Sequence, residues 1–423
     1  MRILALSWRL PYPPDCGGRI RAYNLLRALS QAHEISLISL MWPTESSSSI
    51  EALKAFCHDV ETVPFEPLVN PPGLRNRLAH RLRRWMSYFE WYSHTMDEQV
   101  SAALGRRHYD LVLAMGFDSS PYIEHLEGIP KVLEELEFGL LKDSYEHEGF
   151  TLTGLRLRWT WFKFQKKVRH LCQHIEGCTV ASAIEMEHLH HILPGYDRVH
   201  VIPNGVDIEG FQFQAASKEA YTLIFTGPLT YWPNYDALRY FLRHIYPIIK
   251  RRLPDITLTV TGSIAGVDLS GLPLDDGVKI LGYVNDVRPL VASSSVAIVP
   301  LRLGGGTRLK IIEAMALGTP VVSTSKGAEG LEVIPGQHLL IADDPKGFAE
   351  ACISLLTDRS MSQRLAVAAR ELVEARYDWQ SIGAKLEQFL YAVLSRGKEG
   401  ALEVVAEGKV MPNTGGKGCR ESA

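Results

Sequence analysis

Short runs of apolar, often β-branched residues alternate along the chain with longer stretches of helical periodicity. In the first half these runs are residues 2–7, 34–40, 60–65, 110–115, 131–135, 177–182 and 199–204. Nearly continuous apolar runs are typical of parallel strands buried on both faces. Strands that alternate with helices at this spacing indicate βαβ units. The first half, residues 1–202, is therefore predicted to be a doubly wound, Rossmann-like α/β domain.

The same alternation restarts after a polar stretch at residues 203–220, which we expect to be the interdomain linker. The apolar runs are now residues 221–227, 255–262, 278–284, 295–301, 319–325 and 338–343. Helical patterns between them include residues 234–252, 307–317 and 345–357. Residues 221–377 are therefore predicted to form a second Rossmann-like domain of the same α/β class.

The end of the chain carries one more helical pattern, at residues 379–395. Asp378 precedes it, and an aspartate there can accept from the free amides of a first helical turn. We expect this terminal helix, residues 378–396, to pack back toward the first domain. Residues 397–423 are rich in glycine and charge and poor in large apolar residues, so they are predicted to be a disordered tail.

The length of the chain fits two hydrophobic cores, and its net charge gives no sign of a nucleic-acid-binding surface. A chain of 423 residues is longer than one ordinary core, and a net charge of −3 gives no basic field for nucleic acid. Six cysteines lie without metal-ligand or disulfide-framework spacing, which favours reduced thiols. The N-terminal apolar run is too short for a signal peptide, and no run of 18 apolar residues suggests a spanning helix. We expect a cytoplasmic protein.

The stretch "LRLGGGTRLKIIEAMALGTPVV", residues 301–322, combines a strand end, a glycine loop and a helix start. Glycines let backbone amides approach a ligand, and a helix N-terminus favours an anion such as phosphate. Arg308 and Lys310 add positive charge that suits a diphosphate. Glu313 shares a helix face with Lys310 and can accept from sugar hydroxyls. The alternative is a glycine-rich turn before an amphipathic helix with a surface ion pair, but the combination favours a ligand site.

A second glycine loop lies in residues 11–29, where Gly17 and Gly18 open an amphipathic helix after the first strand. Together with Arg21 it could hold an acceptor or a phosphate group, and a simple tight turn is the alternative. The chain has no GxGxxG motif and no acid at the end of the second strand. This weakens a nicotinamide-binding interpretation.

These motifs resemble those of the family 4, or group 1, glycosyltransferases of GT-B architecture. The resemblance runs from Arg2 to about Leu394. It is carried by residues 11–39, the hinge "VIPNGVD", "FTGPLTYWPNYDAL", residues 281–331 and the Trp379 helix. The motifs of the second half are the more specific ones. The resemblance implies two Rossmann-like domains facing across a cleft, with a nucleotide sugar on the second and an acceptor on the first.

The resemblance also implies site residues. Glu313 falls on the acid that holds the nucleotide ribose, and the loop "GYVND" on the segment that lies along the base. The expected donor-binding residues are Gly304, Gly305, Gly306, Thr307, Arg308, Lys310, Glu313, Gly227, Tyr283 and Val284, and the expected acceptor or phosphate loop comprises Gly17, Gly18 and Arg21.

Two departures from the family pattern affect these expectations. The family usually has a second glutamate eight positions before Glu313, where it contacts the donor sugar, and this chain has Gly305 there. The family also commonly has Arg and Lys after the first strand of the second domain, where this chain reads "GPLTYWPN". We expect Arg308 and Lys310 to replace those cations.

The sequence leaves the general base open and gives no sign of a metal. No two aspartates stand at i and i+2, so we expect cations and helix amides to neutralise the diphosphate without a metal or other cofactor. Asp118 and Glu135 are the candidate catalytic acids, with Glu134 and Glu137 as further candidates; each could equally be a helix cap or an exposed residue. An inverting mechanism needs such a base, whereas in the retaining family resembled the leaving phosphate itself can take the proton.

Two basic, aromatic segments, residues 74–93 and 155–170, have two interpretations. Arginine and lysine beside tryptophan and phenylalanine suit an anionic membrane surface or a lipid-linked acceptor, which would place the protein at the inner face of the cell membrane. Alternatively, the aromatics face the first core and the cations face water.

The sequence therefore predicts an enzyme that moves a sugar from a nucleotide diphosphate sugar to an acceptor hydroxyl. The resemblance implies retention of configuration and an acceptor in polysaccharide, such as exopolysaccharide, or in a lipid-linked glycan. Two alternatives stay open: a nucleotide-sugar epimerase of the same fold, and a module that binds a nucleotide sugar without catalysis.

Overall fold

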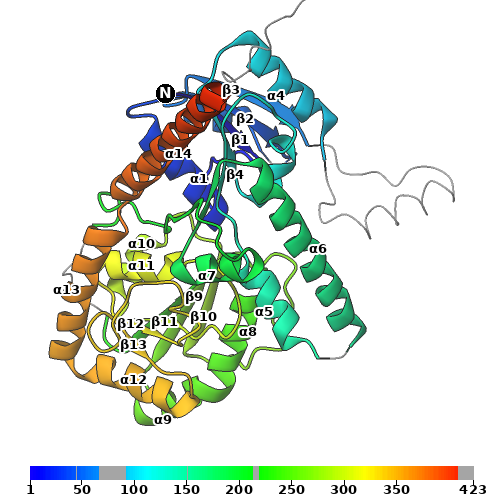
Figure 1. Ribbon diagram of the computed structural model, residues 1–423. Coiled ribbons are helices and arrows are strands. Elements are labelled where there is room, and N and C mark those ends of the chain that lie inside the picture. Colours follow the sequence, from blue (N-terminus) through cyan, green and yellow to red (C-terminus); the bar gives the residue numbers. More distant parts are fainter. Residues whose placement is uncertain (44, 66–91, 150, 213–218, 408–423) are drawn as a thin grey trace, which may run out of the picture.

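Two α/β domains, each built on a parallel sheet, make up the computed structural model of the chain (Figure 1). The structure describes residues 1–43, 45–65, 92–149, 151–212 and 219–407. The basic, aromatic segment at 74–93 thus lies almost wholly outside the described residues, as do residues 213–218 of the expected linker and residues 408–423 of the expected tail. The α/β fold class predicted from the alternation of apolar runs is confirmed.

The first sheet has seven parallel strands in the order β3-β2-β1-β4-β5-β6-β7. They are β1 (Arg2–Ser7), β2 (Glu34–Met41), β3 (Asp59–Pro64), β4 (Leu111–Met115), β5 (Lys131–Glu134), β6 (Gly177–Val180) and β7 (Val199–Val201). The strand order reverses between β1 and β4. In open parallel sheets, ligands bind beyond the carboxyl ends of the strands at such a reversal.

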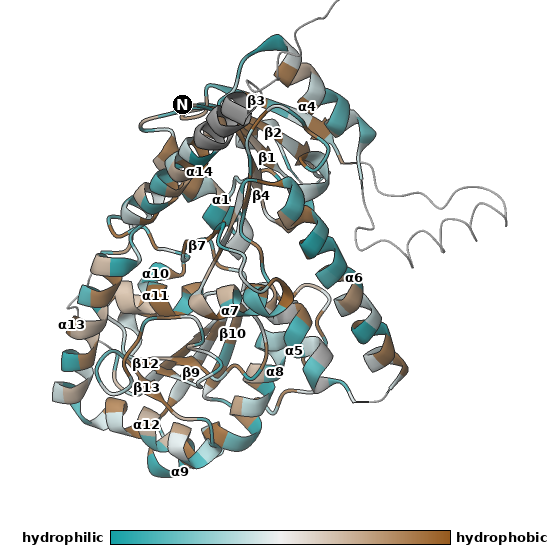
Figure 2. Ribbon diagram, in the orientation of Figure 1, coloured by the Kyte–Doolittle hydropathy of each residue, from teal (hydrophilic) through white to brown (hydrophobic). Residues whose placement is uncertain are grey.

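Helices cover both faces of this sheet. They are α1 (Gly17–Leu29), α2 (Ser47–Lys54), α4 (His94–Arg106), the 3-10 helix η1 (Phe117–Tyr122), α5 (Gly139–His147), α6 (Leu152–His174) and α7 (Ala183–Ile192). Successive side chains of a strand point to opposite faces. Accordingly, Leu4 and Leu6 belong to one buried cluster, and Ile3 and Ala5 belong to another. This two-sided burial explains the nearly continuous apolar runs of the strands, which are mainly brown in Figure 2.

The second sheet has six parallel strands in the order β10-β9-β8-β11-β12-β13, and its order reverses between β8 and β11. They are β8 (Thr222–Thr226), β9 (Thr257–Thr261), β10 (Val278–Gly282), β11 (Val296–Val299), β12 (Val321–Ser323) and β13 (Leu340–Ile341). Its helices are α8 (Trp232–Tyr240), α9 (Tyr246–Arg252), α10 (Arg288–Ser293), α11 (Leu309–Ala316), α12 (Pro345–Thr357) and α13 (Arg359–Arg376).

One helical pattern of the second domain is more divided than predicted. The pattern at residues 234–252 corresponds to α8, a π-helical segment η2 (Phe241–Ile245) and α9. Pro247 lies in the first turn of α9, where its missing N–H costs nothing because first-turn amides lack intrahelical partners. The π segment keeps Phe241 and Ile245 in the buried core of the domain.

The last helix, α14 (Trp379–Glu407), returns to the first domain. Trp379, Ile382 and Leu386 are buried in the same cluster as Leu25 of α1. The two helices approach closely, because a Cβ built on Gly383 would lie 2.3 Å from the Cβ of Ala28. The carboxylate of Asp378 accepts first-turn amides of α14.

The start of the expected disordered tail is helical instead. Residues 397–407 continue α14, and its sequence there, "GKEGALEVVAE", contains several strong helix formers. No helix within the described ranges is both long enough and apolar enough to cross a bilayer.

Candidate active site

The two glycine loops predicted from the sequence meet across the interface between the domains. Gly17 begins α1 at the reversal point of the first sheet, and Leu309 begins α11 at the reversal point of the second. A Cβ built on Gly17 would lie 3.9 Å from Cδ1 of Leu309, whereas one on Gly18 would meet nothing within 4 Å. The strand-end crevices of both domains therefore open toward each other.

Lys310 points from α11 to the loop that follows β8. Its Nζ donates to Oδ1 of Asn234 at 2.8 Å and lies 4.9 Å from the ring centroid of Phe225. Gly227 makes room for this contact: it has φ +127°, and a Cβ there would lie 2.8 Å from the Lys310 Nζ. Gly227 and Lys310, both predicted donor-binding residues, are thus neighbours.

Burial shifts the ionisation of Lys310 and Glu313 toward neutrality. Loss of solvent lowers the pKa of Lys310 to about 7, with Arg308 acting in the same direction and Glu313 opposing it. Loss of solvent also raises the pKa of Glu313 to about 7, and Lys310 opposes that rise. Strongly perturbed groups in a cleft are typical of functional sites. A ligand that brings phosphate oxygens to Lys310 would favour its charged form.

The Arg308 side chain folds back over its own loop, and the residue is only 8% exposed. Its two terminal nitrogens donate to the carbonyl oxygens of Gly304 and Gly305. Its Nε is buried and has no hydrogen-bond partner among the described residues. Leaving a buried donor unsatisfied costs about 1–3 kcal/mol, so an acceptor oxygen bound beside Arg308 would be stabilised.

Carboxylates of the first domain engage the glycine loop. Oδ2 of Asp143, on α5, accepts the amide of Gly304 at 3.0 Å and lies 2.8 Å from Nζ of Lys326. Glu185, on α7, accepts the amides of Phe138 and Gly139 and also bonds the backbone of Gly306. Two of the loop residues predicted to bind an anion thus carry a carboxylate of the protein in this structure.

Two further residues of the predicted loop also touch the first domain. The hydroxyl of Thr307 donates to the carbonyl of Ala181 at 3.3 Å. A Cβ built on Gly139 would lie only 2.6 Å from Cα of Gly305. Such a distance is shorter than real contacts, so the two backbones are in direct contact. This contact holds the glycine loop of the second domain against the backbone of the first.

Three glycines with positive φ line the strand ends beside this loop: Gly227, Gly262 and Gly282. A Cβ on Gly262 would lie 2.3 Å from the carbonyl carbon of Gly227, and its amide donates to the carbonyl of Gly282 at 2.8 Å. Tyr283 follows Gly282 with 66% of its surface exposed, and Val284 is half-buried. These glycines leave the backbone without side chains between Lys310 and the exposed Tyr283 ring. A flat heterocycle can lie along such a surface.

Arg21 is placed differently from the other predicted residues. It is 1% exposed, and its guanidinium donates to Glu134 Oε1 at 2.8 Å, to Asn204 Oδ1 at 3.0 Å and to the carbonyl of Ile202 at 2.7 Å. These contacts tie α1 to β5 and to the start of the linker. The structure therefore places Arg21 behind the first glycine loop, where it is engaged by protein groups rather than facing a ligand.

The two candidate catalytic acids differ in their surroundings. Glu135 directly follows β5 with φ +65°, which is strained for a residue other than glycine. Burial raises the pKa of Glu135 to about 8, with Arg21 opposing the rise and neighbouring acids adding to it. A carboxyl group with such a pKa can exchange a proton near neutrality. Asp118 of η1 is exposed and forms no hydrogen bond or ion pair with another described residue.

Several residues that complete this site were not among the predicted site residues. Asn234 and Lys326 lie inside the quoted motifs, in "YWPNYDAL" and "STSKGAEGL", so their polar type was a usable signal. Asp143 and Glu185 lie on helices of the other domain and have no local signal. They reach the glycine loop only through the packing of the domains.

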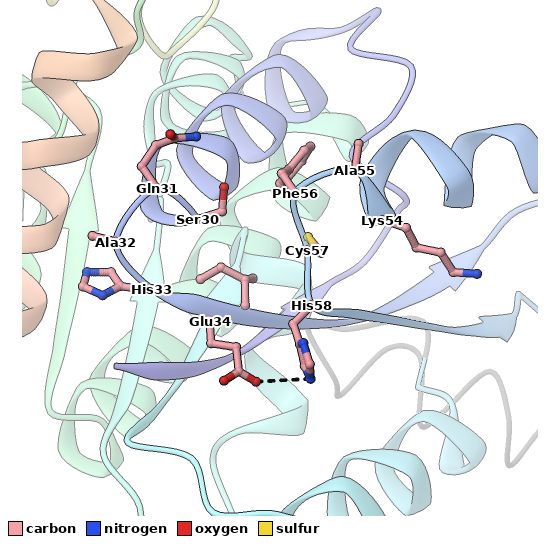
Figure 3. Close-up of a pocket in the computed structure, with 11 residues that line it drawn as sticks. Ser30, Gln31, Ala32, His33, Glu34, Lys54, Ala55, Phe56, Cys57 and His58 are labelled. Atoms are coloured by element: carbon pink, nitrogen blue, oxygen red, sulfur yellow. Dashed lines mark ion pairs between the residues drawn. The ribbon is translucent and has the colours of Figure 1, made fainter.

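A surface hollow elsewhere in the first domain is unrelated to this site. It has a volume of about 410 Å³, and its lining includes His33, Glu34, Lys54 and His58 (Figure 3). Glu34 begins β2 and His58 directly precedes β3, so the hollow lies at the amino ends of the strands, away from the ligand edge. The described residues also contain no group of three or more His, Cys, Asp or Glu side chains suited to a metal ion.

Two doubly wound domains that face each other through their strand ends define the GT-B architecture. The structure matches that of Anabaena HepE, solved in complex with UDP and glucose, with a TM-score of 0.66. The match covers 93% of this chain and 100% of HepE at 17% identity, and it therefore identifies the fold. The predicted GT-B architecture is confirmed.

Family models identify the protein more closely. The Glycosyltransferase Family 4 model matches residues 17–209, and the Glycosyl transferases group 1 model matches residues 220–358. The chain belongs to the group 1, family 4 glycosyltransferases, as its motifs predicted.

Curated relatives align with part of the chain. A glycogen synthase of Mycobacterium tuberculosis is 29% identical over 220 residues, which are 48% of this chain and 51% of the relative. A phosphatidyl-myo-inositol mannosyltransferase of Mycobacterium leprae is 28% identical over 218 residues, 48% of this chain and 56% of the relative. The chain thus spans about half the length of these relatives.

Proposed function

We propose that the protein transfers a sugar from a nucleotide diphosphate sugar to an acceptor hydroxyl of a polysaccharide or lipid-linked glycan. The observation that carries this proposal is the grouping of Arg308, Lys310 and Glu313 at the start of α11, at the reversal point of the second sheet. HepE, which shares the fold, was solved with UDP and glucose, and the relatives include a glycogen synthase and a lipid mannosyltransferase.

Each group has a role in this proposal. Arg308 and Lys310 would bind the diphosphate through charge-assisted hydrogen bonds, which supplies the unpaired Arg308 Nε with an acceptor. Glu313 would accept from the ribose hydroxyls, and Gly227 would leave the backbone bare beside the diphosphate. The amides of Gly304 to Thr307 would add contacts once the carboxylates of Asp143 and Glu185 release the loop backbone. Tyr283 and Val284 would lie along the base.

In this proposal the acceptor binds on the side of the first domain that carries Gly17 and Gly18. Breaking the bond between the sugar and the diphosphate leaves negative charge on the leaving phosphate. Arg308 and Lys310 are placed to stabilise that charge. With retention of configuration, the proton of the acceptor hydroxyl passes to an oxygen of the leaving phosphate. An inverting transfer would instead pass that proton to a general base, and Glu135, with a pKa of about 8, is the candidate for it.

A donor-binding assay tests the assignment of the α11 site. Arg308→Ala and Glu313→Ala should each weaken binding of the preferred nucleotide sugar at least about tenfold, or roughly 1.4 kcal/mol. A panel of nucleotide sugars, screened by the rise in melting temperature that a bound ligand causes, selects the donor. If neither variant loses tenfold in affinity, the loop is not the donor site.

An activity assay separates the proposal from its two alternatives. The protein is incubated with the selected donor and with oligosaccharide or lipid acceptors, and the products are analysed by mass spectrometry and by NMR of the new glycosidic bond. A glycosylated acceptor with the donor's anomeric configuration supports retaining transfer. An epimerised free donor indicates an epimerase, and tight donor binding without turnover indicates a binding module.

A second part of the proposal concerns a membrane surface. Leu152, Leu155 and Phe162 of α6 have exposed fractions of 87%, 55% and 52%, and their spacing places them along one side of the helix. Arg156 and Lys166 of the same helix are also exposed. Figure 1 shows α6 running along the outer edge of the molecule. We propose that this helix contacts an anionic lipid surface.

Vesicle co-sedimentation tests the membrane contact. The protein should bind vesicles that contain anionic phospholipid and should not bind vesicles of phosphatidylcholine alone. The double change Leu155→Glu and Phe162→Glu should abolish binding. Equal sedimentation of the wild type and this double variant would contradict the proposal.

A further inference from the structure

Glu137 is a carboxylate at the domain interface that the roles above do not use. It lies between β5 and α5 in the first domain, and its side chain is exposed. It forms no hydrogen bond or ion pair with another residue in the described parts of the chain. Its neighbours Asp143 and Glu185 differ, because each already bonds the backbone of the glycine loop. Glu137 is thus an acceptor with unused capacity beside the proposed donor site.

The Glu137 carboxylate faces the glycine loop of the second domain. A Cβ built on Gly306 would lie 3.4 Å from Oε1 of Glu137. The Glu137 carboxyl lies within the electrostatic influence of the positive charges of Arg308 and Arg21. Tyr231 belongs to the same surroundings, since both Arg308 and Glu137 influence its pKa. Glu137, Arg308 and Tyr231 are therefore neighbours that come from both domains.

The glycine loop has no carboxylate of its own, and position 305 is a glycine. The backbones of Gly139 and Gly305 are in contact, as shown by the 2.6 Å distance from a Cβ on Gly139 to Cα of Gly305. The carboxylate beside the loop comes instead from Glu137, only two positions before Gly139 in the first domain.

The chemistry of a carboxylate selects which part of a donor it can hold. Ionised carboxylates accept strong hydrogen bonds from hydroxyls, whereas they repel phosphate oxygens. Arg308 and Lys310 would bind the diphosphate. The Glu137 carboxylate is therefore left to accept from the hydroxyls of the sugar. We infer that Glu137 binds hydroxyls of the donor's sugar from across the domain interface. This inference rests on the proposed function, because it assigns one more contact to the same donor.

The inference links sugar recognition to the contact between the domains. Groups that bind nucleotide and diphosphate lie in the second domain, while Glu137 belongs to the first. The sugar is then fully held only when the domains meet. Assembling a site by closure is a common way to exclude water from a reactive donor.

Calorimetric titration with matched ligand pairs tests this role. The pairs are UDP with UDP-glucose and GDP with GDP-mannose, and the pair that the wild-type protein binds more tightly is used for the variants. Glu137→Gln and Glu137→Ala should weaken binding of the nucleotide sugar at least tenfold. Both variants should bind the nucleoside diphosphate within threefold of the wild type. Glu146→Gln is the matched control, since it makes the same charge change on α5 at a side chain that is 51% exposed.

The outcomes separate this inference from the proposed function. Wild-type affinity of Glu137→Gln for both ligands of the pair overturns the inference and leaves the proposed function standing. Equal losses for both ligands also overturn it, because the sugar contact would then not be specific. If the wild type binds neither these four ligands nor any nucleotide sugar of the thermal-shift panel, the proposed function itself fails. Melting curves of each variant show whether it is folded.

Discussion

The two glycine loops look alike in sequence but differ in what surrounds them. Both follow a strand at the point where the strand order of its sheet reverses, and both open a helix, α1 in the first domain and α11 in the second. At α1, Arg21 is fully buried and bonded to Glu134. At α11, the Arg308 Nε has no partner among the described residues, and the pKa of Lys310 is lowered to about 7. Glycines at a helix start therefore define an anion site only where a nearby cation still lacks a hydrogen-bond acceptor.

The largest predicted effect concerns the cation of the first loop. Arg21→Ala leaves Glu134 buried without its ion pair, and breaking one partner of such a pair costs about 3–5 kcal/mol of unfolding free energy. Urea denaturation measures this loss. If Arg21 is structural, the folded fraction of the variant should still bind the donor within about threefold. A large loss of donor affinity with little loss of stability would instead show that Arg21 binds the ligand and is not structural.

The next effect concerns the backbone beside the second loop. Gly227→Ala places a Cβ 2.8 Å from Nζ of Lys310 at a φ of +127°. Strain of this kind costs about 1–3 kcal/mol, and displacement of Lys310 should weaken donor binding about tenfold. Titration calorimetry and thermal melting measure the two losses. Gly266→Ala is a useful control, because it has φ +72° but nothing within 4 Å of its Cβ; it should lose stability without losing donor affinity.

A smaller effect is the pH dependence that Lys310 should give to the second loop. With a pKa of about 7 in the ligand-free protein, Lys310 is protonated below neutrality and loses its charge as the pH rises. Affinity for UDP should therefore fall between pH 7 and 9, by up to about tenfold in total, which corresponds to a rise of one unit in the pKa of Lys310 on binding. Lys310→Arg should remove this fall, because arginine stays charged. Parallel pH profiles of wild type and variant would contradict the assignment.

The smallest predicted effect concerns the open side of the first loop. Gly18→Ala adds a methyl group that would meet nothing within 4 Å, and alanine is favoured over glycine in a helix by about 0.5–1 kcal/mol. The variant should be slightly more stable in urea and should bind the donor as the wild type does. Loss of acceptor turnover alone would assign Gly18 to acceptor binding.

Much of the fold followed from the alternation of apolar runs because strands buried on both faces leave a continuous apolar signature. Every apolar run named in the second half contains a strand, and the helix expected at 345–357 is α12. The exceptions are local. The pattern at 234–252 did not reveal the π segment, because a one-residue change in hydrogen bonding hardly alters the periodicity of apolar residues.

The candidate site was less accessible to sequence reasoning because its contacts cross long separations. Arg308, Lys310 and Glu313 stand within about two helical turns of a glycine loop and could be selected together. The partner of Arg21, Glu134, is 113 positions away, so a cation beside glycines was indistinguishable from a ligand-binding one. Asp143 meets Gly304 across 161 positions, and no local pattern records that contact.

Because Asp143 already accepts the amide of Gly304, a ligand that binds this amide exchanges one hydrogen-bond acceptor for another. The protein's own carboxylate accepts the amide of Gly304 and pairs with Lys326, so it acts as an internal counter-ion. A donor oxygen that takes this amide replaces one acceptor with another, and the number of hydrogen bonds at Gly304 is conserved. Selectivity at this position then depends on the difference between two acceptors, and the displaced Asp143 remains available to Lys326.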